Sequence, residues 1–110
     1  MRGIRERFSV NQADRWPAAL ANLANLTRDY PDAAARVVTN GTGVYALLGN
    51  SDLTQKMALL AQQVEFQVCA NALGEHHINP DHLPYWAQVV PAGIVALAEA
   101  QNEGYAYIKP

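Results

Sequence analysis

Hydrophobic and polar residues alternate in a short run near the middle of the chain. The run is VEFQVC, from Val64 to Cys69, and its odd and even positions separate an apolar set from a set that contains Cys69. This period of two predicts a strand with one apolar and one polar face. The next residues, ANAL, tolerate helix, and Asn71 among them can cap a helix N-terminus. We therefore expect the chain to turn into a helix within a residue or two of Cys69.

The clearest helical pattern lies in the first third of the chain. Hydrophobic residues recur there every three or four positions from Trp16 to Leu26. Asp14 is a suitable N-cap, and Pro17 falls in the first turn, where a missing amide hydrogen costs least. The helix should end before Pro31, because the residue before a proline avoids helical angles.

Two more helices are predicted by the same spacing. One covers 53–61, with Ser51 or Asp52 as its cap, and the other covers 94–103, with Gly104 as the residue that ends it. Both follow short segments that contain Gly or Pro and are typical of turns.

Short apolar or β-branched runs supply the remaining strands. We expect a weak, exposed strand over 4–10, because charged residues interrupt it, and a strand covered on both faces over 35–39. Two others are predicted over 87–90 and 105–108. The segment 74–84 has loop composition, with at most a short helical turn at Pro80.

Strands that alternate with helices in this order predict an α/β fold with a mainly parallel sheet and helices on both faces. Ligands of such folds bind at the carboxyl ends of the strands. Three segments should meet there, and from them we predict a site with Cys69 as the catalytic residue and the following binding residues: Asn40, Gly41, Ala70, Asn71, Pro91 and Gly93. The glycines of 40–43 could cradle an anion, although tight-turn geometry is the simpler explanation of them.

Cys69 is the only cysteine of the 110 residues. A single cysteine excludes an internal disulfide, a CxxC pair and a multi-cysteine zinc site, so sulfur chemistry needs a thiol from another molecule. Backbone amides at the start of the following helix would stabilise a thiolate and make the sulfur a better nucleophile. The alternative is that Cys69 is a small, buried hydrophobic residue, as many free cysteines are.

Histidines are concentrated just after this segment. His76 and His77 are added to the predicted binding residues because they could pass protons to the thiol if their loop folds back. A metal site built from these histidines, His82, Glu75 and Cys69 is a weaker hypothesis, because adjacent histidines point apart and the spacing matches no standard zinc pattern. We therefore predict no metal and no cofactor.

Charge and hydropathy narrow the class of protein. A net charge of −2 and a pI near 5.8 argue against a nucleic-acid partner. The longest apolar runs are far shorter than the roughly 20 residues that cross a bilayer, and the N-terminus lacks the apolar core of a signal peptide. We expect one domain, 1–110, in a cytoplasmic protein without a membrane partner.

Three segments resemble the DsrE/DsrF-like proteins of intracellular sulfur oxidation and sulfur relay. They are VVTNGTGVYALL, VEFQVCANAL and VVPAGIVALAEAQNEGYAYIKP, and the similarity extends from Trp16 to Pro110. The resemblance implies a three-layer α/β/α sandwich with about five strands and assembly into homo-oligomers, either trimers or hexamers. It also implies a cysteine after a central strand that carries persulfide sulfur, and the matching residue here is Cys69.

The sequence therefore favours a sulfur-relay protein, with sulfurtransferase activity, that carries persulfide sulfur on Cys69 between donor and acceptor proteins. The alternative is a non-enzymatic oligomeric module whose strand-end pocket binds a small ligand or a partner segment, with Cys69 as part of the lining. The two differ in whether function depends on the thiol.

Overall fold

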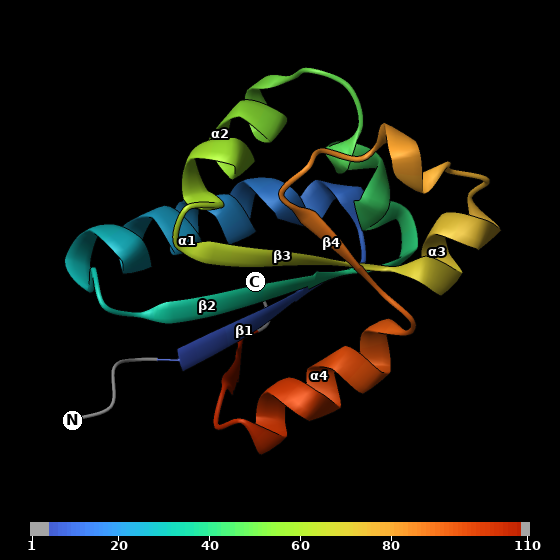
Figure 1. Ribbon diagram of the computed structural model, residues 1–110. Coiled ribbons are helices and arrows are strands. Elements are labelled where there is room, and N and C mark those ends of the chain that lie inside the picture. Colours follow the sequence, from blue (N-terminus) through green and yellow to red (C-terminus); the bar gives the residue numbers. More distant parts are fainter. Residues whose placement is uncertain (1–4, 109–110) are drawn as a thin grey trace.

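Five parallel strands form one sheet at the centre of the computed structural model, which describes residues 5–108 (Figure 1). The spatial order is β4-β3-β2-β1-β5, and every neighbouring pair is parallel. The bounds of β1 to β5 are, in order, Arg5–Val10, Ala34–Thr39, Val64–Cys69, Ala87–Val90 and Ala106–Ile108. The chain thus builds the sheet outward from β1 to β4 and then returns to add the three-residue β5 at the other edge.

Helices cover both faces of this sheet. The helices α1 (Trp16–Asp29) and α2 (Asp52–Leu60) lie on one face, and α4 (Gly93–Asn102) lies on the other (Figure 1). A short α3 (Ala70–Glu75) follows β3 directly. Three 3₁₀ helices, η1 (Ala13–Arg15), η2 (Gly41–Leu47) and η3 (Pro80–His82), complete the connections. The predicted three-layer α/β/α sandwich with a mainly parallel sheet is confirmed.

The main core lies between the sheet and the helices α1 and α2. Phe8, Val37 and Phe66 are neighbours across β1, β2 and β3, and all three are fully buried. The Trp16 ring packs against Phe66 with their centroids 6.2 Å apart, and the Trp16 indole Nε1–H donates to the carbonyl of Gly43 at 2.7 Å. Burial of aromatic and branched side chains on this face supplies most of the hydrophobic stabilisation.

The opposite face of the sheet is more polar. The Arg36 guanidinium pairs with Glu65 at 2.7 Å on the next strand and with Glu103 at 2.6 Å beyond α4, and it lies 4.5 Å from the Tyr105 ring centroid. Burial acts to lower the pKa of Arg36, but hydrogen bonds to Glu65 and Glu103 outweigh it and the pKa is raised. The predicted polar face of β3 is confirmed. On this face, Glu65 pairs with Arg36 of the same chain.

The predicted first strand is present as β1, but the prediction that it is weak and exposed is wrong. β1 lies inside the sheet between β2 and β5, and its Phe8 and Val10 are 1% and 0% exposed. The charges that suggested exposure occupy the start of the strand, whereas the apolar residues of its second half face the main core. Ile4, where the predicted strand begins, lies outside the described residues, as do Lys109 and Pro110 at the end of the predicted domain.

Two predicted helix caps are also wrong. Asp14 lies within η1, so α1 begins at Trp16 with Arg15 as an N-cap that makes no side-chain capping bond. Asn71 lies within α3, whose N-cap is Cys69. The helix α1 begins later than the capping propensity of Asp14 suggests, and α3 begins earlier than that of Asn71 suggests. The other caps are confirmed: Ser51 and Thr54 form a reciprocal capping box on α2.

Gly104 ends the last helix as predicted, with a positive φ of 89° that glycine adopts without strain. The predicted short turn at Pro80 is η3. No helix within residues 5–108 is both long and apolar enough to cross a bilayer.

Candidate functional site

Cys69 lies where the central strand becomes a helix. It is the last residue of β3 and the N-cap of α3, so the predicted turn into helix is confirmed within one residue. The side chain makes no capping hydrogen bond to the first turn of α3, and the residue is only 7% exposed. Across the sheet, Cys69 pairs with Val90 of β4. The thiol is therefore covered at the carboxyl end of the sheet.

Two other strand ends bring Asn40 and Gly93 to the same place. A Cβ at position 93 would lie 3.2 Å from Asn40 Nδ2 and 3.5 Å from Cys69 Cβ. Asn40 directly follows β2 and Gly93 begins α4, so both come from connections next to β3. The three predicted segments, which contain Asn40, Cys69 and Gly93, thus meet at the carboxyl end of the strands. Glycine at position 93 allows the backbone of α4 to approach the thiol closely.

Asn40 carries one of three buried side-chain polar atoms without a hydrogen-bond partner among the described residues; the others are Thr39 Oγ1 and Gln67 Oε1. In Asn40 the unpaired atom is Oδ1, while the backbone N–H donates to the Val10 carbonyl at 3.1 Å. Buried polar atoms are paired in the great majority of cases, so an unpaired one invites an explanation. The Asn40 amide lies near Cys69, since its Nδ2 and Cys69 Cβ are both next to Gly93, and the Oδ1 of that amide can accept a hydrogen bond from a bound group.

Gly41 and Gly43 are required by close backbone contacts. Gly41 has a φ of 54°, and a Cβ there would lie 2.5 Å from the Asn11 carbonyl oxygen; at Gly43 it would lie 2.6 Å from that of Val10. Both residues therefore fit η2 tightly against the chain after β1. This geometry accounts for the glycines without an anion, which agrees with the simpler of the two explanations.

The two histidines lie at the far end of α3 from the thiol. His76 is the C-cap of this six-residue helix, which spans about 9 Å. Its Nδ1 is 3.0 Å from the Tyr45 hydroxyl, and the two rings pack edge to face at 5.0 Å. His77 is exposed with a φ of 55°. The fold-back on which their proton-transfer role depends is not seen, because Tyr45 of η2 holds His76 instead.

Tyr45 is not among the predicted site residues, because its partner His76 is 31 residues away and no local sequence pattern connects the two. Of the other predicted binding residues, Ala70 is partly buried, and Asn71 and Pro91 are exposed. Within the described chain no three His, Cys, Asp or Glu residues are grouped closely enough to hold a metal ion. The candidate site at the carboxyl end of the strands thus consists of the Cys69 thiol, the Asn40 side-chain amide and the N-terminus of α4.

A comparison with protein-family models identifies the family of this chain. The model of the DsrE/DsrF-like family matches residues 8–110, which is nearly the whole chain. The chain belongs to the DsrE/DsrF-like family. The resemblance inferred from the sequence is confirmed, and Cys69 of this DsrE-like protein lies at the end of a central strand.

Solved structures agree with the family. The chain is similar to a protein of unknown function, MTH1491 from Methanobacterium thermoautotrophicum, with a TM-score of 0.89 and 29% identity over 97% of this chain and 99% of that one. It is also similar in fold to the ychN protein from E. coli, with a TM-score of 0.80 and 14% identity over 97% of this chain and 100% of that one. A comparison with curated proteins gives no match.

Proposed function

We propose that this DsrE-like protein is a sulfur carrier that holds persulfide sulfur on Cys69. The observation that carries the proposal is the position of the thiol, at the carboxyl end of the central strand and beside Asn40 and Gly93. Parallel α/β folds place their chemistry at this edge. Membership of a family broadly linked to sulfur relay adds support.

The proposed reaction needs no oxidant or cofactor. The Cys69 thiolate attacks the outer sulfur of a donor persulfide, R–S–SH, and forms a new S–S bond while the donor S–S bond breaks. The products are Cys69–S–SH and the donor thiolate. An acceptor thiolate then attacks the outer sulfur and releases the Cys69 thiolate. Donor and acceptor are proteins or small thiols that reach the edge of the sheet.

Asn40 has a defined part in this proposal. The Asn40 amide lies near Cys69, so its Nδ2–H would donate a hydrogen bond to the terminal sulfur of the loaded persulfide when that sulfur is ionised, and its unpaired Oδ1 would accept one from the S–H when it is protonated. Asn40→Ala should therefore shorten the lifetime of the loaded state. The variant should still accept sulfur, because the nucleophile is unchanged.

Intact-mass measurement after incubation with glutathione persulfide tests the proposal. The wild-type chain should gain one sulfur atom per Cys69 and lose it on addition of excess thiol. Cys69→Ser keeps the size of the side chain and removes the soft nucleophile, so it should gain none while its circular dichroism and thermal unfolding stay those of the wild type. Failure of the folded wild-type protein to gain sulfur would overturn the proposal.

A binding module is the second candidate, and the burial of Cys69, at 7% exposure, favours it. In that case the thiol would be part of the lining of a site for a small ligand or partner segment. Alkylation of Cys69 that left such binding intact, in a protein that never gains sulfur, would decide for this candidate.

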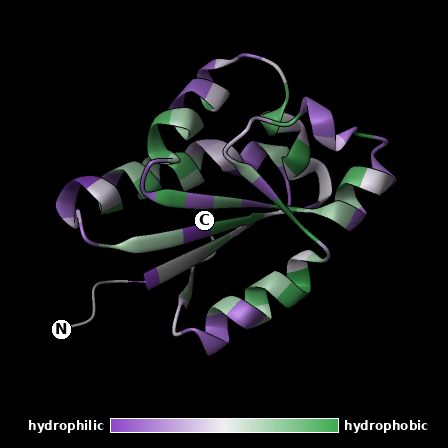
Figure 2. Cartoon of the chain, in the orientation of Figure 1, coloured by the Kyte–Doolittle hydropathy of each residue, from purple (hydrophilic) through white to green (hydrophobic). Residues whose placement is uncertain are grey.

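We also propose that the protein assembles into a homo-oligomer, a trimer or a pair of trimers. Large hydrophobic side chains are exposed along the edge strand β4 and the start of α4, and Figure 2 shows the hydrophobic colour of α4. The exposed fractions are 99% for Tyr85, 42% for Val89, 77% for Ile94 and 51% for Val95. Exposed apolar groups on an edge strand and on the elements joined to it are typical of subunit interfaces.

A further inference from the structure

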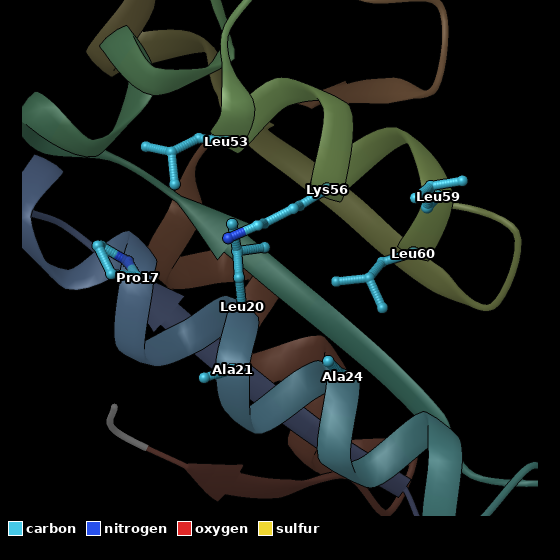
Figure 3. Close-up of a pocket in the computed structure, with 8 residues that line it drawn as sticks. All are labelled: Pro17, Leu20, Ala21, Ala24, Leu53, Lys56, Leu59 and Leu60. Atoms are coloured by element: carbon cyan, nitrogen blue, oxygen red, sulfur yellow. The ribbon is translucent and has the colours of Figure 1, made fainter.

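An apolar groove separates α1 from α2 on the face of the molecule away from α4 (Figure 3). Its volume is about 490 Å³. The residues that line it come only from these two helices: Pro17, Leu20, Ala21, Ala24, Leu53, Lys56, Leu59 and Leu60. The groove is thus separate from Cys69, which lies at the end of β3.

The sequence of the two helices explains why the groove is open. On α1 the wall includes the small residues Ala21 and Ala24 beside Leu20, and a larger residue at either alanine position would fill part of the groove. Leu20 is 3% exposed, whereas Leu59 on the rim is 74% exposed. An exposed leucine beside an unfilled apolar groove leaves hydrophobic surface in water, and a ligand that covers it gains the corresponding transfer free energy.

Lys56 is the one charged residue of the lining. Its side chain extends from α2 across the groove towards α1 (Figure 3). No carboxylate among the described side chains lies within ion-pair distance of its ammonium group, and no lining residue is acidic. An ammonium group at the edge of an apolar surface attracts an anion whose remaining part is hydrophobic.

We propose that this groove binds a small amphipathic carboxylate, such as a medium-chain fatty acid. The carboxylate pairs with Lys56, and the alkyl chain lies along Leu20, Leu53 and Leu60. A volume of about 490 Å³ falls in the range of roughly 300–1,000 Å³ of small-ligand sites. This proposal does not depend on the sulfur-carrier function, because the two sites use different residues on different parts of the fold.

A second copy of this chain is a less suitable occupant. Apart from Leu59 on the rim of the groove, exposed large hydrophobic residues lie on other elements, with Val89 on the edge strand β4 and Ile94 and Val95 on α4, which covers the other face of the sheet. The groove has only eight lining residues and a single unpaired charge, which suits one small charged ligand better than a broad interface.

Isothermal titration of the full chain with hexanoate, octanoate and decanoate, kept below their micelle concentrations, tests the proposal. We expect one saturable site per chain, with an affinity that rises about fourfold for each added methylene until the groove is full. Lys56→Met should weaken octanoate binding about tenfold and leave 1-octanol binding unchanged, because only the charge is lost. Arg28→Met, which removes an exposed cation at the other end of α1, is the matched control and should bind as the wild type does.

Ala24→Leu fills the groove and should abolish binding of both octanoate and octanol. Ala18→Leu, on the same helix but outside the lining, should change neither, and both variants should keep the thermal stability of α1 because leucine is a good helix former. Absence of saturable binding to the wild type, or binding that Ala24→Leu leaves unchanged, would contradict the proposal. A change of oligomeric mass in folded Ala24→Leu would assign the groove to a second copy and equally overturn it.

Discussion

Gly93, at the start of α4, lies next to Cys69 with room for only a methyl group between them. A Cβ at position 93 would come within 3.5 Å of Cys69 Cβ and 3.2 Å of Asn40 Nδ2. The start of α4 is therefore part of the cover that leaves Cys69 only 7% exposed. We therefore expect this contact to limit the access of alkylating reagents to the Cys69 sulfur.

Substitution of this glycine should change the reactivity of the thiol more than the stability of the fold. Gly93→Ala places a methyl group 3.2 Å from the Asn40 amide, which must shift slightly, and in van der Waals contact with Cys69; the better helix propensity of alanine offsets the strain, so we expect the free energy of unfolding to change by less than about 1 kcal/mol. Alkylation of Cys69 by iodoacetamide should slow several-fold. Gly74→Ala in α3 is the matched control, because no atom lies within 4 Å of a Cβ there, and it should leave the alkylation rate unchanged. Equal rates in wild type and Gly93→Ala would disprove the role of this contact.

Much of this arrangement could be predicted from local sequence pattern. The alternation in β3 gave its two faces, and the change from alternation to ANAL placed Cys69 at the start of a helix. The parallel order of elements then put Asn40 and Gly93 at the same edge as Cys69.

The parts that could not be predicted depend on contacts between distant residues. The charged residues of β1 suggested an exposed strand, but its place between β2 and β5 is set by pairing with residues about 30 and 100 positions later. His76 lies against Tyr45, which no local pattern connects with it. The groove between α1 and α2 likewise depends on the relative placement of two helices.

The hydrogen bond from Trp16 to Gly43 should be important for stability. Trp16→Phe keeps most of the ring packing but leaves the buried Gly43 carbonyl without its donor, which should cost about 1–3 kcal/mol. Urea unfolding followed by circular dichroism measures this. Trp86→Phe is the comparison, since Trp86 is partly exposed and contacts Phe66 through its ring. A smaller loss in Trp16→Phe than in Trp86→Phe would contradict the expectation.

The ion pairs of Arg36 should contribute modestly and depend on salt. Glu65 and Glu103 are about half exposed, at 52% and 51%, so Glu65→Gln and Glu103→Gln should each cost about 0.2–1 kcal/mol, less at high ionic strength. The pKa of Arg36 is raised, so its contribution is complete below the pKa of the unfolded chain and is lost only as the pH rises through the higher folded value. Urea unfolding of wild type and Arg36→Met should therefore show a stability difference that does not vary between about pH 6 and pH 9. A difference that fell across this range would contradict the assignment.

His76 should be a structural residue and not a proton carrier for the thiol. Its Nδ1 lies against the Tyr45 hydroxyl at the end of α3 away from Cys69. His76→Ala should leave the rate of sulfur loading unchanged and lower the free energy of unfolding by about 1 kcal/mol, with Tyr45→Phe giving a smaller loss because its ring remains. Loading followed by mass spectrometry at several pH values checks this, and a lost pH dependence in folded His76→Ala would restore the catalytic role.

The proposed oligomer makes the last prediction. If copies of the chain associate through β4 and the start of α4, a charge in place of Ile94 must be buried without a partner, which strongly disfavours association. Ile94→Lys should therefore shift the mass measured by light scattering from a trimer or hexamer towards the monomer, while its circular dichroism stays native because the replaced side chain is 77% exposed in the single chain. Leu59→Lys is the matched control, since Leu59 is similarly exposed, at 74%, but lies on the opposite layer, and it should keep the wild-type mass. A monomeric wild type across the micromolar range would exclude the oligomer, and dissociation by Leu59→Lys alone would move the interface to the α1–α2 layer.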